Sequence, residues 1–255
     1  MSELQTPPPG RRLIGTAGWG IHKDIGHAFP ADGSQLERYA AVLPAVEINS
    51  SFYRPHQPQT YARWAAGTPE DFRFSVKLPR TITHDAKLRE VDVLLDRFAG
   101  EAGQLGDKLG CVLIQLPPKG LFDEAVVRDF LPRLRTRFGC MLAVEARHPT
   151  WFSELATEVL REAQVTRVIA DPAAGQPGPH VPTTGASYLR LHGSPKIYYS
   201  DYPRATLRRV EQDVAARVRE GFDCWCIFDN TAAFAAVPNA LEVLNGGPAG
   251  DETGD

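Results

Sequence analysis

Short apolar runs recur along the chain, and segments with a helical spacing of apolar residues separate most of them. Each run is about five to seven residues long, which is a normal strand length. The runs are Leu13–Gly18, Ala45–Ser50, Phe72–Leu78, Gly110–Leu116, Cys140–Ala146, Val165–Ala170, Ala186–His192 and Asp223–Asp229. This alternation of strands with helices predicts parallel βαβ units.

Two helix starts can be assigned from capping residues. Ser34 and Glu37 have the spacing of a capping box, in which the hydroxyl and the carboxylate each accept a hydrogen bond from a backbone N–H. Asp123 can cap a helix over Glu124–Phe138, and Gly139 is expected to end that helix because glycine tolerates a positive φ.

Two further helices are predicted near the C-terminus. Thr206–Glu220 has apolar residues at intervals of three or four and is followed by Gly221, which is typical of an amphipathic helix with a glycine at its end. Thr231 is expected to cap the last helix, which Asn245 and Gly246 should end.

Two connections have a weaker pattern. Between Arg80 and Gly110 we expect a loop and then a helix from about Ala86. The segment from Asp171 to Gly185 is rich in Pro and Gly, which favours an irregular loop over a full helix.

Eight strands with seven or eight helices predict a single α/β domain, a (β/α)8 TIM-like barrel. We expect the barrel to cover residues 12–246, with disordered tails over residues 1–11 and over the acidic residues 247–255. An open doubly wound sheet is the alternative. No GxGxxG or GxxxxGK[ST] motif follows any strand, so the sequence offers no nucleotide-cofactor motif.

Charge and cysteine content narrow the class of protein. The net charge is −3, whereas proteins that bind nucleic acid without sequence preference usually carry a basic excess. The four cysteines lie in apolar runs without the spacing of zinc ligands, so we expect buried, reduced thiols and a cytoplasmic protein. The sequence has no recognisable secretory signal and no apolar stretch long enough to cross a membrane.

The alternation of side chains along each strand predicts which residues point into the barrel, because the outer face must pack on helices. The last strand is apolar on both faces, and Asn230 points inward there if Ile227 and Asp229 point outward. The other inward polar residues are Glu47, Asn49, Ser75, Lys77, Gln115, Glu145, Arg190 and His192, with Arg147 just beyond its strand. All lie in the last half of their strands, which predicts a polar C-terminal face, where barrel enzymes place their active sites.

Five motifs follow one another along the chain: Glu47–Tyr53, Phe74–Lys77 with Thr83 and His84, Val144–Trp151, Tyr188–Gly193 and Phe228–Asn230. In these motifs the sequence resembles the YecE-like family, a domain of unknown function, from about Leu13 to Asn245. The resemblance implies a TIM-like barrel, similar in shape to metal-dependent barrel endonucleases, with a suggested nucleic-acid role. The family often has Phe-Asn-Asn where this chain has Phe228-Asp229-Asn230.

Basic side chains outnumber acidic ones among the residues expected at the C-terminal face, which favours an anionic ligand. The basic candidates are Lys77, His84, Arg147, Arg190 and His192. Arginine binds phosphate or carboxylate through two parallel hydrogen bonds. Gly193 could add backbone N–H groups or only permit a tight turn, and Asn230 would open a helix whose N-terminus attracts anions.

Glu47 and Glu145 are the candidates for catalysis because they are predicted on opposite sides of the barrel. Two facing carboxylates can act as general acid and base, and Lys77 would stabilise negative charge that develops during the reaction. Alternatively the residues form ordinary ion pairs, Glu47 with Lys77 and Glu145 with Arg190, and each carboxylate only orients its partner.

Aromatic residues in the predicted loops could stack on a sugar or a base, or only pack over the barrel. The segment Tyr198–Tyr202 is the candidate lid. The predicted substrate-binding residues are Trp19, Asn49, Tyr53, His84, Arg147, Arg190, His192, Gly193 and Asn230.

A divalent metal is disfavoured as a cofactor. Glu47, Glu145, His192 and Asp229 are possible ligands, but no HxH or HExxH spacing supports them and several cations lie nearby. We therefore assign no metal ligand.

The sequence favours an enzyme, a hydrolase, lyase or isomerase, that uses acid–base chemistry on a small phosphate- or carboxylate-bearing substrate. A nucleic-acid-processing, endonuclease-like barrel and a non-catalytic ligand-binding module are the alternatives.

Overall fold

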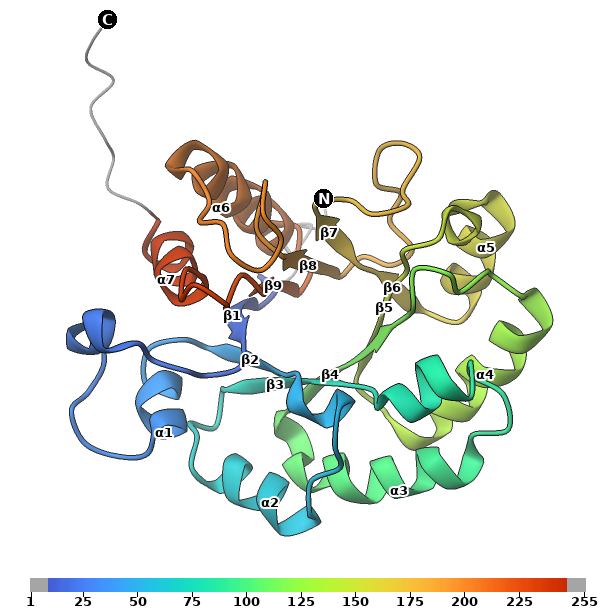
Figure 1. Ribbon diagram of the computed structural model, residues 1–255, viewed down its shortest axis with the longest axis horizontal. Coiled ribbons are helices and arrows are strands. Elements are labelled where there is room, and N and C mark those ends of the chain that lie inside the picture. The colour runs from blue at the N-terminus through green and yellow to red at the C-terminus, as the bar shows by residue number, and fades with distance from the viewer. Residues whose placement is uncertain (1–8, 247–255) are drawn as a thin grey trace, which may run out of the picture.

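The computed structural model describes residues 9–246, in which nine parallel strands form one sheet. The strands are β1 (Arg12–Ala17), β2 (Ala45–Ile48), β3 (Arg73–Lys77), β4 (Leu109–Gln115), β5 (Met141–Glu145), β6 (Val165–Arg167), β7 (Ile169–Asp171), β8 (Ser187–Leu191) and β9 (Cys224–Phe228). Their order is β6-β5-β4-β3-β2-β1-β9-β8-β7, and Figure 1 shows them as a ring viewed along its axis.

The ring is closed through the chain itself. β6 and β7 are two halves of one extended stretch, separated only by Val168. β6 pairs with β5, and β7 pairs with β8. The two ends of the sheet are therefore consecutive in sequence, and the eight predicted strand positions of a TIM-like barrel are confirmed.

Helices surround the outside of the strands. They are α1 (Gln35–Ala40), α2 (Pro58–Ala66), α3 (Asp92–Ala102), α4 (Glu124–Arg137), α5 (Glu154–Glu162), α6 (Arg204–Arg219) and α7 (Ala236–Asn245). Four short 3₁₀ helices, η1 (Lys23–Ala28), η2 (Ser50–Phe52), η4 (Gly103–Lys108) and η5 (Pro149–Phe152), and one π-helical turn, η3 (Thr81–Asp85), lie in the connections.

Capping residues explain several of these boundaries. The capping box is confirmed, because the Ser34 hydroxyl accepts from the Glu37 N–H and the Glu37 carboxylate accepts from the Ser34 N–H. The Asp123 carboxylate accepts from the Val126 N–H at the start of α4. The prediction for Gly139 was wrong, since α4 ends at Arg137 where Phe138 turns to an extended conformation.

Residues with positive φ explain where several helices begin or end, including two starts that the sequence pattern placed too early. Gly221 and Gly246 have positive φ after α6 and α7, as predicted. The last helix is not capped by Thr231, because Phe234 has a φ of 63° and α7 begins only at Ala236. Similarly, α3 begins at Asp92 rather than near Ala86, since Lys87, Leu88 and Glu90 all have positive φ. An L-residue in this conformation cannot continue a right-handed helix.

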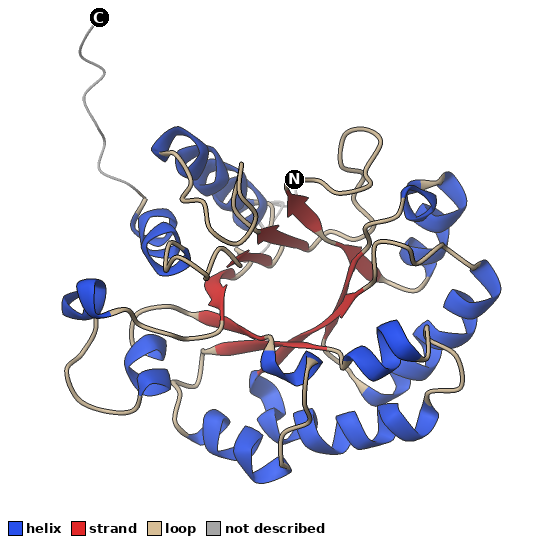
Figure 2. Ribbon diagram, in the orientation of Figure 1, coloured by secondary structure: helices blue, strands red, loops and turns tan. Residues whose placement is uncertain are grey.

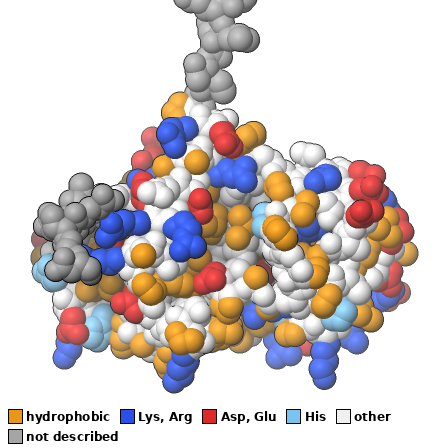
Figure 3. Space-filling view, turned by 90° about the horizontal axis from the view of Figure 1, so that it is seen from above, with side chains coloured by type: hydrophobic (Ala, Val, Ile, Leu, Met, Phe, Trp, Pro, Cys, Tyr) orange, Lys and Arg blue, Asp and Glu red, His pale blue; other side chains and the backbone are white. Residues whose placement is uncertain are grey.

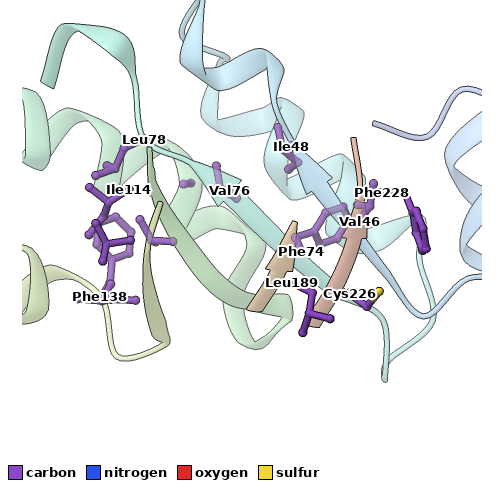
Figure 4. Packing of buried hydrophobic residues seen from close by; sticks show 14 of the residues in the cluster. Val46, Ile48, Phe74, Val76, Leu78, Ile114, Phe138, Leu189, Cys226 and Phe228 are labelled. Carbon is purple, nitrogen blue, oxygen red and sulfur yellow. The ribbon is translucent and has the colours of Figure 1, made fainter. Parts of the chain in front are cut away.

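The alternation of side chains produces two apolar layers. Outward-facing residues such as Val46, Phe74 and Leu189 belong to one buried apolar cluster, and Figure 4 shows their side chains beside the strands. A second cluster fills the barrel interior and contains Leu13, Ala45, Cys111, Leu113, Ala143, Val168, Tyr188, Trp225 and Ile227. The Tyr188 and Trp225 rings are stacked there at 5.8 Å, so the lower part of the barrel is a packed core.

Most of the predicted N-terminal tail lies outside the described residues, as does the acidic tail over 247–255. Gly10 and Arg11, which we expected in that tail, are instead attached to the barrel. The Gly10 N–H donates to the Val218 carbonyl, and Arg11 forms an ion pair of 2.6 Å with Asp223. All four cysteines are free thiols, and three of them are buried. Within residues 9–246 no helix is long and apolar enough to cross a membrane.

The connection from β7 to β8 is a loop, where a regular (β/α)8 barrel has a helix (Figure 2). Arg167 holds this loop against the barrel from a buried position at the end of β6. Its guanidinium donates to the carbonyls of Trp151 and Val181 and to the Thr157 hydroxyl, at 2.9–3.2 Å. Arg167 therefore joins the Val181 carbonyl of the loop to Trp151 of η5 and Thr157 of α5.

We expect Arg167→Met to lower the free energy of unfolding by about 2–4 kcal/mol, because the buried Trp151 carbonyl and Thr157 hydroxyl lose their donor. Chemical denaturation at neutral pH measures the change. Arg128→Met is the matched control, since Arg128 forms exposed ion pairs on α4 and its loss should cost less than about 1 kcal/mol. Equal effects of the two substitutions would contradict the role of Arg167.

Candidate functional site

A buried arginine lies at the centre of the C-terminal face of the barrel. Arg190 on β8 is 1% exposed and contacts carboxylates from three other strands or strand ends. Its Nε and Nη2 donate to both oxygens of Glu47 at 2.9 and 2.6 Å, and its Nη1 donates to Glu145 at 2.8 Å. Asp229 lies 3.1 Å from Nη2. The guanidinium therefore neutralises charges that would be costly to bury alone.

Below Arg190, Tyr188 connects Glu47 to the apolar interior. The Tyr188 hydroxyl lies 2.8 Å from both Glu47 Oε2 and Ser75 Oγ. A phenol has one proton, so it donates to the carboxylate, which can only accept, and it can accept from the serine. Tyr188 was not among the predicted site residues, although it has the same parity as Arg190 along β8 and could have been recognised from the alternation.

Above Arg190, His192 lies between two carboxylates. Its Nδ1 is 3.0 Å from Asp229 Oδ2, and its Nε2 is 3.1 Å from Glu145 Oε1. Arg147 donates to the same Glu145 oxygen from Nε and Nη2, at 3.0 and 2.6 Å. We call the six residues Glu47, Glu145, Arg147, Arg190, His192 and Asp229 the arginine cluster.

The electrostatic state of the cluster follows from these contacts. Burial disfavours the charged form of Glu145, but Arg190, His192 and Arg147 outweigh it and hold the pKa of Glu145 well below its usual range. Asp229 likewise has a lowered pKa, since Arg190 and His192 outweigh its burial. The hydrogen bonds from His192 to Asp229 and Glu145 raise the pKa of His192 despite burial, so the imidazolium form is favoured.

The structure gives the orientation of the last strand, which the sequence left open, and it is not the one that would point Asn230 inward. Trp225 and Ile227 belong to the interior cluster, so Asp229, two residues further on, also points inward. Asn230 points the other way, where its Nδ2 donates to the Ser200 carbonyl and to Asn239 Oδ1. Asn230 is therefore not part of the barrel interior. The sequence could not decide between the two orientations because both faces of β9 are apolar.

Lys77, at the end of β3, lies beside the cluster but makes no ion pair with a described residue. Its Nζ donates to Asn49 Oδ1 at 3.1 Å and lies 4.2 Å from the centre of the Phe52 ring. Of the two ion pairs considered from the sequence, Glu145 with Arg190 is confirmed, whereas Glu47 pairs with Arg190 rather than with Lys77. Burial and the positive charge of Arg190 lower the pKa of Lys77 to about 8, against the opposing effect of the nearby carboxylates.

The remaining predicted binding residues lie around the cluster rather than in it. His84 packs against Phe52 and bonds to Thr83, at the edge of the same face. Tyr53 is 72% exposed, and Trp19 packs edge-to-face on Trp64 of α2, away from Arg190. The Gly193 N–H is bonded to the Tyr202 hydroxyl, so it offers no free donor to an anion.

Tyr198, in the predicted lid, contacts the cluster directly. Its ring packs edge-to-face against His192 at 5.9 Å, and its side chain is 42% exposed. The segment Tyr198–Tyr202 therefore contacts the arginine cluster at His192, and its role as a lid stays a prediction.

The carboxylates of the cluster do not form a metal site in this arrangement. The guanidinium of Arg190 occupies the position among Glu47, Glu145 and Asp229 that a cation would need. In the part of the chain that the structure describes, no group of three or more His, Cys, Asp or Glu side chains is arranged to hold a metal ion.

Comparison with known proteins identifies the family of this chain. The model of the family described as "Protein of unknown function DUF72" matches residues 13–246. The chain belongs to the DUF72 family. This confirms the resemblance to YecE-like proteins.

Two relatives and a solved structure illustrate the similarity of this DUF72 chain to other proteins. It is 35% identical to the UPF0759 protein YecE of Escherichia coli K12 over 144 residues, which are 54% of this chain and only 52% of that protein. It is 28% identical to the UPF0759 protein YunF of Bacillus subtilis 168, over 91% of this chain and 93% of YunF. The crystal structure of a DUF72 family protein from Thermotoga maritima MSB8 superposes with a TM-score of 0.76 and 26% identity, covering 92% of this chain and 98% of the other.

We expect Arg190→Met to lower the free energy of unfolding of this DUF72 protein by about 3–5 kcal/mol at pH 7, because three buried carboxylates lose their shared cation. Urea denaturation followed by circular dichroism measures the loss. Arg128→Met, which removes exposed ion pairs with Glu124 and Glu162, should change stability by less than about 1 kcal/mol. A loss below 1 kcal/mol for Arg190→Met would show that the cluster is not held as described.

The lowered pKa of Lys77 has a consequence for the pH dependence of stability. Between about pH 8 and the ordinary lysine value of 10.5, the unfolded chain binds more protons at this residue than the folded chain. The free energy of unfolding therefore gains a contribution as pH rises through this window, by at most ~1.4 kcal/mol per pH unit.

Lys77→Met removes this contribution. The difference in free energy of unfolding between wild type and Lys77→Met is therefore expected to increase by roughly 2–3 kcal/mol from pH 7.5 to pH 10. Lys23→Met, at an exposed position, should run parallel to wild type over the same range. Parallel curves for Lys77→Met and wild type would contradict the burial of an ionising amine.

Proposed function

We propose that this DUF72 barrel is an enzyme that acts on a small phosphate- or carboxylate-bearing substrate at its C-terminal face, with Lys77 as the residue that transfers a proton. The observation that carries the proposal is the position of Lys77. It is a buried amine with no carboxylate partner among the described residues, beside a cluster whose own charges are paired. With a pKa of about 8, it exchanges protons efficiently near neutral pH.

The arginine cluster would provide the electrostatic setting. Arg190, Arg147 and protonated His192 balance the negative charges of Glu47, Glu145 and Asp229. These carboxylates would therefore not repel an anionic substrate that binds above them, because their charges are already paired. The cationic form of Lys77, together with the partly exposed guanidinium of Arg147, would attract it.

The contacts favour different roles for the two glutamates from the acid–base pair expected from the sequence. Glu47 is fully buried, and Arg190 and Tyr188 occupy both of its oxygens, so we propose that it positions Arg190. Glu145 accepts from Arg147 and His192 on the side toward the loops, and we propose that it orients these two donors toward the substrate.

A small ligand fits the surface better than a nucleic acid. The net charge of the chain is −3, whereas proteins that bind a phosphate backbone without sequence preference usually carry a basic excess. On the side of the barrel drawn in Figure 3, Lys and Arg side chains also lie among Asp and Glu side chains, so that side offers no continuous basic surface.

The test is to incubate the protein with a panel of sugar phosphates, nucleoside monophosphates and hydroxy- or oxo-carboxylates, and to search for products by mass spectrometry. For the substrate so found, we expect Lys77→Met and Lys77→Arg to lower kcat about 100-fold or more, because neither side chain exchanges a proton near neutral pH. Arg147→Gln should instead raise KM about tenfold.

Lys23→Met serves as the control and should keep both constants. Retained turnover in Lys77→Met would remove Lys77 from the mechanism. Tight binding of a panel compound without any product would favour a non-catalytic ligand-binding module.

A further inference from the structure

A cleft lies between two loops on the C-terminal side of the barrel, and no residue of the arginine cluster lines it. The loop from β3 to α3 forms one side, and the connection from β4 to α4 forms the other. Its volume is about 560 Å³, within the range that small-molecule sites occupy in proteins. We call it the β3–β4 cleft.

The inner surface of the cleft is apolar and rigidly held. Leu88, Leu116 and Val127 line it as buried side chains. Trp151 completes this surface, with its Nε1 donating to the Gly120 carbonyl at 2.9 Å and its ring packed against Phe122. Such a surface can enclose a ring or a branched aliphatic group.

The outer edge of the cleft carries more cations than carboxylates. Four basic residues line it, whereas Asp85 and Asp123 are the only acidic ones among the described lining residues. Arg80 pairs with Asp85 at 3.1 Å, and Arg89 pairs with Asp123 at 2.8 Å. The other two cations, Lys87 and Lys119, are exposed and have no ion-pair partner among residues 9–246.

The loop on the β3 side is shaped by unusual backbone conformations. Thr81–Asp85 forms a π-helical turn, a feature that often occurs at functional sites. Lys87 and Leu88 follow with φ values of 52° and 68°, in the left-handed region that non-glycine residues seldom occupy. These conformations place the Leu88 side chain inward and the Lys87 side chain at the exposed edge. The fold therefore maintains the cleft at a conformational cost.

We propose that the β3–β4 cleft binds an amphipathic anion, namely an aromatic or branched aliphatic body that carries one phosphate, sulfate or carboxylate group. The body would lie on Leu116, Val127 and Trp151, and the anionic group would lie between Lys87 and Lys119. This site is separate from Lys77. His84 lines the cleft but Lys77 does not, and the Phe52 ring contacts both side chains. The proposal therefore does not depend on the proposed catalytic role of Lys77.

Isothermal titration calorimetry with 1-naphthyl phosphate tests the proposal, with 1-naphthol and inorganic phosphate as the two partial ligands. We expect the full probe to bind at least about tenfold more tightly than either part, and more weakly as salt is added. The double variant Lys87→Ala/Lys119→Ala should lose about tenfold or more in affinity. Val126→Trp, which adds bulk to a residue lining the cleft without removing a charge, should lose a similar amount.

Arg133→Ala on the outer side of α4 and Lys77→Met should both bind the probe as wild type does, within about twofold. The exposed lysine pair can be replaced without disturbing the core, which circular dichroism would verify. Absence of binding at millimolar probe, or binding that survives both the lysine pair and Val126→Trp, would refute the site. Loss of binding in Lys77→Met would also refute it, because the probe would then bind at Lys77 instead.

Discussion

The polar half of this barrel depends on one guanidinium. Arg190 contacts Glu47, Glu145 and Asp229, which come from strands on different sides of the ring, and it is almost completely buried. Burying any one of these carboxylates without the arginine would cost a large desolvation free energy, and so would burying the arginine without the carboxylates. The cluster therefore stabilises the structure only when all of its members are present. It also fixes the relative positions of β2, β5, β8 and the end of β9.

Much of the fold could be predicted because the alternation of apolar and polar residues along a strand indicates which side chains face the helices and which face the barrel interior. The alternation along β2, β3, β5 and β8 correctly placed Glu47, Lys77, Glu145 and Arg190 inside the barrel. The same rule gave no answer for β9, where Trp225 and Ile227 face inward and Cys226 and Phe228 face outward, all of them apolar. The orientation of Asp229 depends on which of these equally apolar faces fits the interior, and that is decided by packing in three dimensions.

Features that depend on backbone conformation were harder to predict. Lys87, Leu88 and Phe234 are left-handed without being glycine or asparagine, so no residue type in the sequence marked the delayed starts of α3 and α7. Lys87 and Leu88 also line the β3–β4 cleft, so the shape of the cleft could not be predicted from the sequence either. The pairing of Glu47 with Arg190 rather than Lys77 is a similar case, because both cations were predicted on the correct face and only geometry distinguishes them.

The pairing of β1 with β9 has a consequence for how the chain folds. Most neighbouring strands in the ring are joined by one connecting segment, but Arg12 lies beside Cys224, and Arg11 bonds to Asp223, 212 residues away in sequence. Ordering these contacts requires closing a loop that contains nearly the whole domain, with an entropy cost that grows with its length. Successive βα units can form earlier from local contacts. We therefore expect ring closure between the first and last strands to be the slow step of folding, and an open sheet with two free edges to precede it.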